Sequence, residues 1–187
     1  MRIVGGKLRG KRLSEVGAGD KAAQLRPTSD RVRENLFNVL TNGALGNLVA
    51  EARVLDICAG TGALGLEALS RGAAHVLFID NGRAALRLIE QNIALCNGGD
   101  LTRILATDAL GLRVNDDDPY DLVFLDPPYG KDYAATVLGH LLVGKWLADN
   151  ATVVVEENRE IPTIQGFERM DHRRYGDTHL HLFRPLD

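Results

Sequence analysis

Short apolar runs alternate with stretches of helical periodicity between residues 53 and 157. A continuous apolar run is typical of a strand that is buried on both faces, and apolar positions three to four residues apart predict a helix with one buried face. A further short strand is expected to end near Asp108. The remaining predicted strands are 53–58, 74–80, 121–126 and 151–157, and the predicted helices are 62–71, 83–96 and 132–146.

This alternation of strands and helices predicts an α/β fold with right-handed crossovers between parallel strands. Residues 166–175 and 178–184 differ, because two extended runs around Gly176 and Asp177 predict an antiparallel hairpin. We therefore expect a Rossmann-like, mostly parallel seven-stranded sheet with a C-terminal antiparallel hairpin. Ligands of such sheets bind beyond the carboxyl ends of the strands.

The chain before the first strand predicts a small extension and a helix. Residues 1–13 alternate weakly and are expected to form a small hairpin, followed by a loop. Thr28 or Ser29 is expected to cap a helix that buries one face. We divide the chain into a basic N-terminal arm, 1–27, and a main domain, 28–187.

Charge is distributed unevenly along the chain. Residues 1–33 carry nine Lys/Arg and three Asp/Glu, whereas all 187 residues carry 22 Lys/Arg and 25 Asp/Glu. A basic arm on an acidic body fits the docking of a polyanion, although charge alone fits a solvated terminus equally well. No signal-peptide core, membrane-length apolar run or metal-type cysteine spacing is present in the sequence. We expect a cytoplasmic protein that has no membrane partner and acts as a monomer.

A glycine-rich turn follows the first buried strand. The stretch DICAGTGALG (56–65) satisfies G-x-G-x-x-G, and Asp80 follows at the distance seen in dinucleotide-binding folds. Asp56 adds a carboxylate at the strand end, which would repel a pyrophosphate. The same carboxylate suits S-adenosylmethionine (AdoMet), which carries an ammonium and a sulfonium group. Capping of the turn is the structural alternative for Asp56.

Two more aspartates end the next two strands. Asp80 can accept hydrogen bonds from both ribose hydroxyls of a dinucleotide or of AdoMet. Asp108 can accept a hydrogen bond from an adenine amino group, although an aspartate in this position is often only a helix cap.

The strand at 121–126 ends in the sequence Asp-Pro-Pro-Tyr. Because prolines cannot continue a strand, the turn is expected to present Asp126, the Pro127 carbonyl and Tyr129. Two acceptors can hold the N–H groups of an exocyclic amine and turn its lone pair toward a methyl donor. Tyr129 can stack on a single-stranded or flipped-out base. The alternative is a proline turn with a surface tyrosine.

The presence of Asp rather than Asn at position 126 bears on which nucleobase is methylated. Guanine offers N1–H and N2–H as adjacent donors, and a carboxylate can accept both. An asparagine amide would set a donor against N1–H. Asp126 therefore mildly favours guanine N2 as the methyl acceptor.

These motifs resemble the RsmD family of AdoMet-dependent 16S rRNA guanine-N2 methyltransferases. The resemblance covers nearly the whole chain, through MRIVGGKLRGKRL, LRPTSDRVRENLFNVL, DICAGTGALGLEALSRGA, LFIDN, ATDAL, DLVFLDPPYG and RYGDTHLHLF. It implies an AdoMet-dependent methyltransferase fold. It also implies N2-methylation of one guanine (position 966 in the usual rRNA numbering) in a partly or fully assembled small subunit. Cys58 departs from the pattern, since many relatives have an aromatic or aliphatic residue there.

Motif positions and the resemblance together give three sets of candidate residues. The catalytic set is Asp126, Pro127, Pro128 and Tyr129. The AdoMet-binding set is Asp56, Cys58, Ala59, Gly60, Thr61, Gly62, Asp80, Asn81, Asp108 and Ala109. The set expected to bind RNA phosphates is Lys7, Arg9, Lys11, Arg12, Arg26, Arg31 and Arg33. Arg26 and Arg31 could equally pair with acids of the core.

Three alternative functions remain open. A DNA adenine-N6 methyltransferase shares DPPY but should need a larger recognition segment. A dinucleotide oxidoreductase is disfavoured by Asp56 and DPPY, and the intact set of strand-end aspartates argues against a non-catalytic RNA-binding assembly factor.

Histidines near the C-terminus offer few metal ligands. His179 and His181 share one face of a predicted strand, with His172 opposite them at best. Because nothing supplies the remaining ligands, we expect ordinary surface histidines and no metal site.

Overall fold

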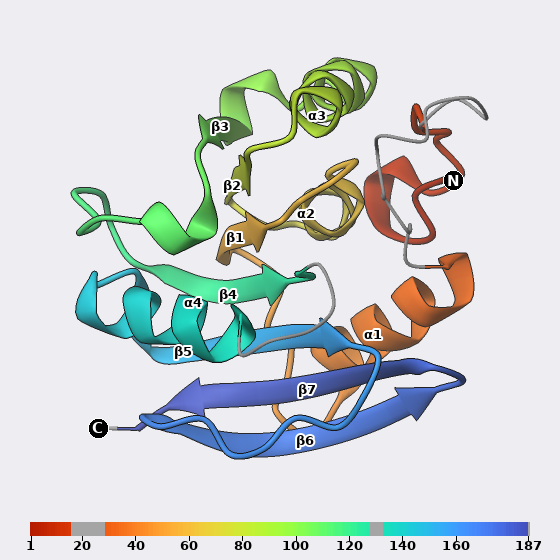
Figure 1. Ribbon diagram of the computed structural model, residues 1–187. Coiled ribbons are helices and arrows are strands. Elements are labelled where there is room, and N and C mark those ends of the chain that lie inside the picture. Colours follow the sequence, from red (N-terminus) through yellow and green to blue (C-terminus); the bar gives the residue numbers. More distant parts are fainter. Residues whose placement is uncertain (16–28, 128–132, 187) are drawn as a thin grey trace.

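A computed structural model describes residues 1–15, 29–127 and 133–186, which form one seven-stranded sheet with helices on both faces (Figure 1). The strands lie in the order β3-β2-β1-β4-β5-β7-β6. Strands β1 to β5 are parallel, and β7 is antiparallel to β5 and β6, which confirms the predicted sheet and hairpin. The strands are β1 (Arg53–Ile57), β2 (His75–Asp80), β3 (Thr102–Ala106), β4 (Tyr120–Leu125), β5 (Leu147–Glu157), β6 (Phe167–Tyr175) and β7 (Thr178–Pro185).

The helices divide between the two faces of the sheet. Side chains of α1, α2 and α3 pack on one face, and those of α4 pack on the other. None of the helices within the described ranges is long and apolar enough to cross a membrane. The helices are α1 (Asp30–Asn42), α2 (Ala63–Ser70), α3 (Arg83–Leu95) and α4 (Tyr133–Val143), with short 3-10 helices η1 (Gly6–Leu8), η2 (Gly99–Leu101) and η3 (Ala109–Gly111).

Alternate residues of the central strands supply the two halves of the core. Val54 and Phe78 face α1, α2 and α3, whereas Leu55 and Ile79 face α4. All four side chains are 0% exposed. Burial on both faces explains why these strands are continuous apolar runs in the sequence.

The boundary between α4 and β5 differs from the prediction. The helix ends at Val143 rather than 146, because Gly144 N closes the last turn on His140 O and Lys145 adopts a left-handed φ of 57°. Strand β5 then begins at Leu147, which pairs with Tyr120 ahead of a register shift.

Residues 1–13 form the predicted small hairpin. Arg2 and Arg12 are bridge partners, and Ile3 N donates to Lys11 O at 2.9 Å. Ile3 and Leu13 are buried in the core, so this segment belongs to the folded body. Figure 1 shows it in red beside α2, on the side of the molecule toward which β1 and β4 point.

The start of α1 follows its sequence signal. Ser29 is the N-cap, and its Oγ accepts a hydrogen bond from Val32 N at 3.3 Å. Leu36 and Leu40 are buried on the face that packs against the sheet.

Candidate active site

The four aspartates of the predicted cofactor-binding and catalytic sets lie at one edge of the sheet. Asp56 lies near the end of β1, Asp80 ends β2, Asp108 follows β3, and Asp126 follows β4. Asp126 N donates to Ile57 O at 3.3 Å, which prolongs the pairing of β4 with β1. Because these strands are parallel, their carboxyl ends bring the four aspartates to the same edge.

Asp56 caps the helix that follows the glycine-rich turn. Its side chain is 2% exposed, and Oδ2 accepts a hydrogen bond from Gly65 N at 2.9 Å in the first turn of α2. Burial raises the pKa of Asp56 to about 8, with a smaller contribution from Asp80. The structural role left as an alternative for Asp56 is therefore observed.

The glycines of the turn meet local steric needs. Gly62 has a left-handed φ of 74° and is the N-cap of α2. A Cβ atom on Gly65 would lie 2.4 Å from Phe78 Cε1 and 2.7 Å from Val76 Cγ1, so this glycine lets α2 pack closely on β2. Both needs are the same for any ligand at this edge, so the glycine pattern alone does not identify the cofactor.

Asp80 holds the loops after β1 and β2 together. Its Oδ2 accepts from Gly60 N at 2.9 Å, and its Oδ1 accepts from Gly82 N at 2.8 Å. The side chain is half-buried, and each carboxylate oxygen has a second lone pair for a ligand hydroxyl.

Asp108 is the centre of a small polar group at the end of β3. Asn81 Nδ2 donates to Asp108 Oδ2 at 3.3 Å, and the Tyr133 hydroxyl donates to Asp108 Oδ1 at 3.4 Å. Asp108 also caps η3, whose first residue, Ala109, is buried. Cys58 Sγ lies 3.8 Å from the Tyr133 hydroxyl. Sequence reasoning missed Tyr133, although it begins the helix that follows DPPY.

The backbone of the glycine-rich turn is held from two sides. Ala59 N donates to Ile79 O at 3.2 Å, and Thr61 O accepts from Asn92 Nδ2 at 2.9 Å. The Asn92 amide also exchanges hydrogen bonds with Ser14, whose N donates at 2.7 Å and whose O accepts at 3.2 Å. Asn92, which is fully buried on α3, thus joins the turn to the N-terminal segment.

Asp126 and Pro127 lie directly after β4, as predicted. Asp126 is half-buried and Pro127 is buried. Pro128 and Tyr129 lie outside the described residues, so the stacking role of Tyr129 stays a prediction.

Two glutamates at the end of β5 belong to the surroundings of Asp126. Glu156 and Glu157 are both buried. Burial raises the pKa of Asp126 well above its usual value, and repulsion from Glu156, Asp56 and Glu157 raises it further. Sequence reasoning did not assign these glutamates, although the run ATVVVEE places two acids at the end of the fifth strand.

Most of the predicted RNA-binding residues are accessible. Arg26 lies outside the described residues. The exposed members of the set are Lys7, Arg9, Lys11, Arg12 and Arg31.

Arg33 was wrongly included in the RNA-binding set. Its side chain is 0% exposed, and Nη2 donates to Asp30 Oδ1 at 2.8 Å and to Arg2 O. Arg33 Nε lies 3.8 Å from Glu67 Oε2, and Arg71 Nε donates to Glu67 Oε1 at 2.8 Å. These contacts tie α1 to α2 in the core, where a phosphate has no access.

The side chains at the carboxyl edge suit a cationic nucleoside. Carboxylates accept hydrogen bonds from hydroxyl and amino groups and attract positive charge, whereas they repel a pyrophosphate. The carboxylates at this edge therefore suit a cationic nucleoside such as AdoMet better than a dinucleotide.

Comparison with known proteins agrees with this chemistry. The chain matches the family model described as Conserved hypothetical protein 95 over residues 1–184. It is 37% identical over 166 residues to ribosomal RNA small subunit methyltransferase D of Escherichia coli strain K12, covering 88% of this chain and 79% of that protein.

Solved structures share the fold over most of the chain. The structure of yhhF from Escherichia coli has a TM-score of 0.84 and 34% identity, covering 99% of this chain and 97% of that chain. An RNA methyltransferase from Salinibacter ruber in complex with S-adenosyl-L-homocysteine has the same fold, with a TM-score of 0.65, 15% identity and coverage of 87% and 95%. The chain therefore belongs to the RsmD family, the methyltransferase family that its motifs resemble.

Proposed function

We propose that the protein methylates the exocyclic N2 of a guanine in small-subunit (16S) rRNA, with AdoMet as the methyl donor. Membership of a methyltransferase family supplies the reaction class. The observation that carries the choice of acceptor is Asp126, a half-buried carboxyl followed by Pro127 at the carboxyl edge.

Asp126 and the Pro127 carbonyl would act as paired acceptors. They would hold the two N2–H groups, so that the nitrogen lone pair points at the methyl group. The same contacts stabilise the positive charge that develops on nitrogen during transfer. The N–H becomes acidic only after methylation, so no strong base is needed beforehand.

The ionisation state of Asp126 is central to this role. Burial and the neighbouring carboxyls raise the pKa of Asp126, which makes its carboxylate form less favourable than that of an exposed aspartate. AdoMet, when bound, supplies the methyl group and a positive charge on sulfur. A positive charge beside Asp126 favours the carboxylate. This is the form that can accept hydrogen bonds from both N1–H and N2–H of guanine.

The remaining predicted residues would hold the cofactor. Asp80 would accept the ribose hydroxyls, and Asp108 would accept the adenine amino group, with Tyr133 and Asn81 orienting its carboxylate. Asp56 would act mainly through the helix cap, since its Oδ2 is already engaged.

The basic segment would guide rRNA to this edge. Its exposed cations (Lys7, Arg9, Lys11 and Arg12) are carried by a hairpin packed against α2, on the side to which the central strands point (Figure 1). We therefore retain residues 1–27 as the RNA-binding arm and residues 28–187 as the methyltransferase domain, although the hairpin core is part of the folded body.

Transfer of labelled methyl groups tests the proposal. The protein would be incubated with labelled AdoMet and rRNA, either naked or in small subunits, and the labelled nucleosides would be identified. We expect N2-methylguanosine. Labelled N6-methyladenosine, or no incorporation into any form of the RNA, would overturn the assignment.

A further inference from the structure

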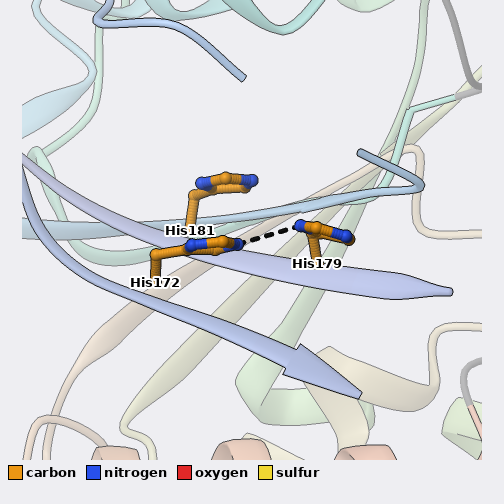
Figure 2. A group of neighbouring side chains, drawn as sticks. All are labelled: His172, His179 and His181. Carbon is orange, nitrogen blue, oxygen red and sulfur yellow. Dashed lines mark hydrogen bonds between the residues drawn. The ribbon is translucent and has the colours of Figure 1, made fainter. Parts of the chain in front are cut away.

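Three histidines gather on one face of the C-terminal hairpin, and we call them the histidine cluster (Figure 2). His172 on β6 is the register partner of His181 on β7, and His179 lies two residues before His181. All three side chains therefore share one face, so His172 lies beside the other two. One ring nitrogen from each histidine lies within 4.8 Å of the others.

His181 has an unsatisfied nitrogen. Its side chain is fully buried, and Nε2 lies 3.3 Å from Arg159 O. A neutral imidazole has one N–H and one lone pair, so an N–H on Nε2 leaves the lone pair on Nδ1. Nδ1 is buried and has no hydrogen-bond partner within the described ranges. Such atoms are uncommon in folded proteins and call for an explanation.

A ring with one nitrogen bonded to a carbonyl and the other nitrogen left without a partner is typical of a metal-binding histidine. Metal ligands usually donate their second ring N–H to a carbonyl or carboxylate, which fixes the tautomer. The Arg159 carbonyl takes that place for His181.

Two cations lie beside the cluster on β6. Arg169 is paired with Glu160 at 2.9 Å, which offsets its charge. Arg174 is the register partner of His179, and its Nε donates to Gly176 O at 2.9 Å.

The other two rings can reach an ion beside His181. His172 and His179 are half-exposed and share one hydrogen bond, between Nε2 and Nδ1 at 2.9 Å. The rings of His172 and His181 are stacked, 4.5 Å apart and 4° from parallel. Zn–N bonds are about 2.0–2.1 Å long and lie in the plane of each imidazole, so an ion requires the rings of His172 and His179 to rotate out of this stacked arrangement and give up their mutual hydrogen bond.

We propose that the histidine cluster binds one divalent transition-metal ion of the zinc type through three imidazole nitrogens, with water as a fourth ligand. The site lies on the two strands at the β6 edge of the sheet and shares no residue with the candidate active site. A bound ion would cross-link β6 to β7. It would therefore raise the thermal unfolding midpoint of the protein.

Metal titration of the full-length, tag-free protein tests this site. After chelator treatment, Zn²⁺ binding would be measured by calorimetry, and Co²⁺ would be added as a spectroscopic substitute. We expect one ion per chain and the visible absorption of a tetrahedral, nitrogen-ligated Co²⁺. The double variant H172Q/H179Q should bind Zn²⁺ at least about tenfold more weakly, because even changes to residues around metal ligands lower metal affinity by that much.

His75→Gln is the matched control, because it removes a half-exposed histidine from β2, outside the cluster. It should leave the affinity and stoichiometry unchanged. Three results would each overturn the proposal: no stoichiometric binding, equal affinity in the folded double variant, or a cobalt–thiolate absorption band, which would move the ion to a cysteine. Methyl transfer is a separate measurement, so the failure of either proposal is recognised independently.

Discussion

Asp126 shows how position alters the chemistry of a single carboxyl group. The end of β4 places it beside Glu156, Glu157 and Asp56, and burial adds to their repulsion. Its pKa is therefore raised in the free protein, and the positive charge of the cofactor would favour the carboxylate that the proposed acceptor role needs.

Replacement of Asp126 separates chemistry from cofactor binding. Asp126→Ala should lower the single-turnover rate of methyl transfer by about 10²- to 10³-fold, as expected when one transition-state contact is lost. AdoMet affinity, measured by calorimetry, should change little. Asp116→Ala, an exposed aspartate before β4, is the control and should behave as wild type. A D126A variant with normal turnover would refute the mechanism.

The raised pKa of Asp56 predicts that the folded protein becomes less stable as pH rises. This pKa is about 8 in the folded protein, against an ordinary value of 3.8, so between these pH values the folded state keeps a proton that the unfolded chain has released. The free energy of unfolding should therefore decrease with rising pH, by at most about 1.4 kcal/mol per pH unit from this group.

Urea titrations of the cofactor-free protein across that pH window check the sign. Asp56→Asn keeps an oxygen for Gly65 N but cannot ionise, so its unfolding free energy should vary less with pH. An equal pH slope in D56N and wild type would contradict the assignment.

At the scale of elements, buried ion pairs join α1 to α2. Glu67 lies between Arg33 and Arg71, and it also accepts a hydrogen bond from Val4 N at 2.7 Å. The Arg71 guanidinium lies 5.0 Å from the centre of the Phe37 ring. One carboxylate thus anchors α1, α2 and the N-terminal segment.

Removal of that carboxylate should be costly. Glu67→Gln leaves the buried Arg33 without its carboxylate on α2, and loss of one partner of a buried pair costs about 3–5 kcal/mol. Chemical denaturation would measure the loss. Glu34→Gln, on the exposed side of α1, should cost less than about 1 kcal/mol. Similar losses in both variants would show that the buried network contributes little.

The elements themselves were largely predictable from the sequence. Strands buried on both faces are apolar throughout, so their positions were found to within one or two residues, apart from the start of β5. That start depends on pairing with Tyr120, which no local pattern reveals. Arg33 was misassigned for the same reason, because its partner Glu67 lies on another element.

The candidate site was predictable only in part. Aspartates at strand ends stand out because they interrupt apolar runs. Tyr133 and Glu156 did not stand out, since their relevance depends on which loops meet at the carboxyl edge. The histidine cluster likewise depends on the register of β6 against β7.

At the scale of the whole molecule, the N-terminal hairpin, which carries exposed cations, lies on the side toward which β1 and β4 point (Figure 1). Reversing the charges of Arg9, Lys11 and Arg12 to Glu should weaken rRNA binding and reduce its salt dependence, because fewer phosphate contacts release counterions. AdoMet affinity should stay nearly constant. Binding isotherms at several salt concentrations would measure both effects.

The matched control is Arg113→Glu, an exposed arginine whose carbonyl accepts a hydrogen bond from Trp146 Nε1 at 2.7 Å, next to the start of β5. It should leave rRNA affinity unchanged. Equal affinity of the triple charge-reversal variant and wild type would remove the arm from the RNA-binding surface.

Asn92 has a thermodynamic consequence for the order of events on the enzyme. One buried amide holds both Ser14 of the arm and Thr61 of the glycine-rich turn, so a ligand that fixes either segment also restrains the other. Linkage is reciprocal: if AdoMet tightens rRNA binding, rRNA must tighten AdoMet binding by the same factor. Asn92→Ala should bring that factor close to one, as measured by AdoMet titrations with and without rRNA. An unchanged factor in a folded N92A protein would show that the two ligands are coupled by another route or act independently.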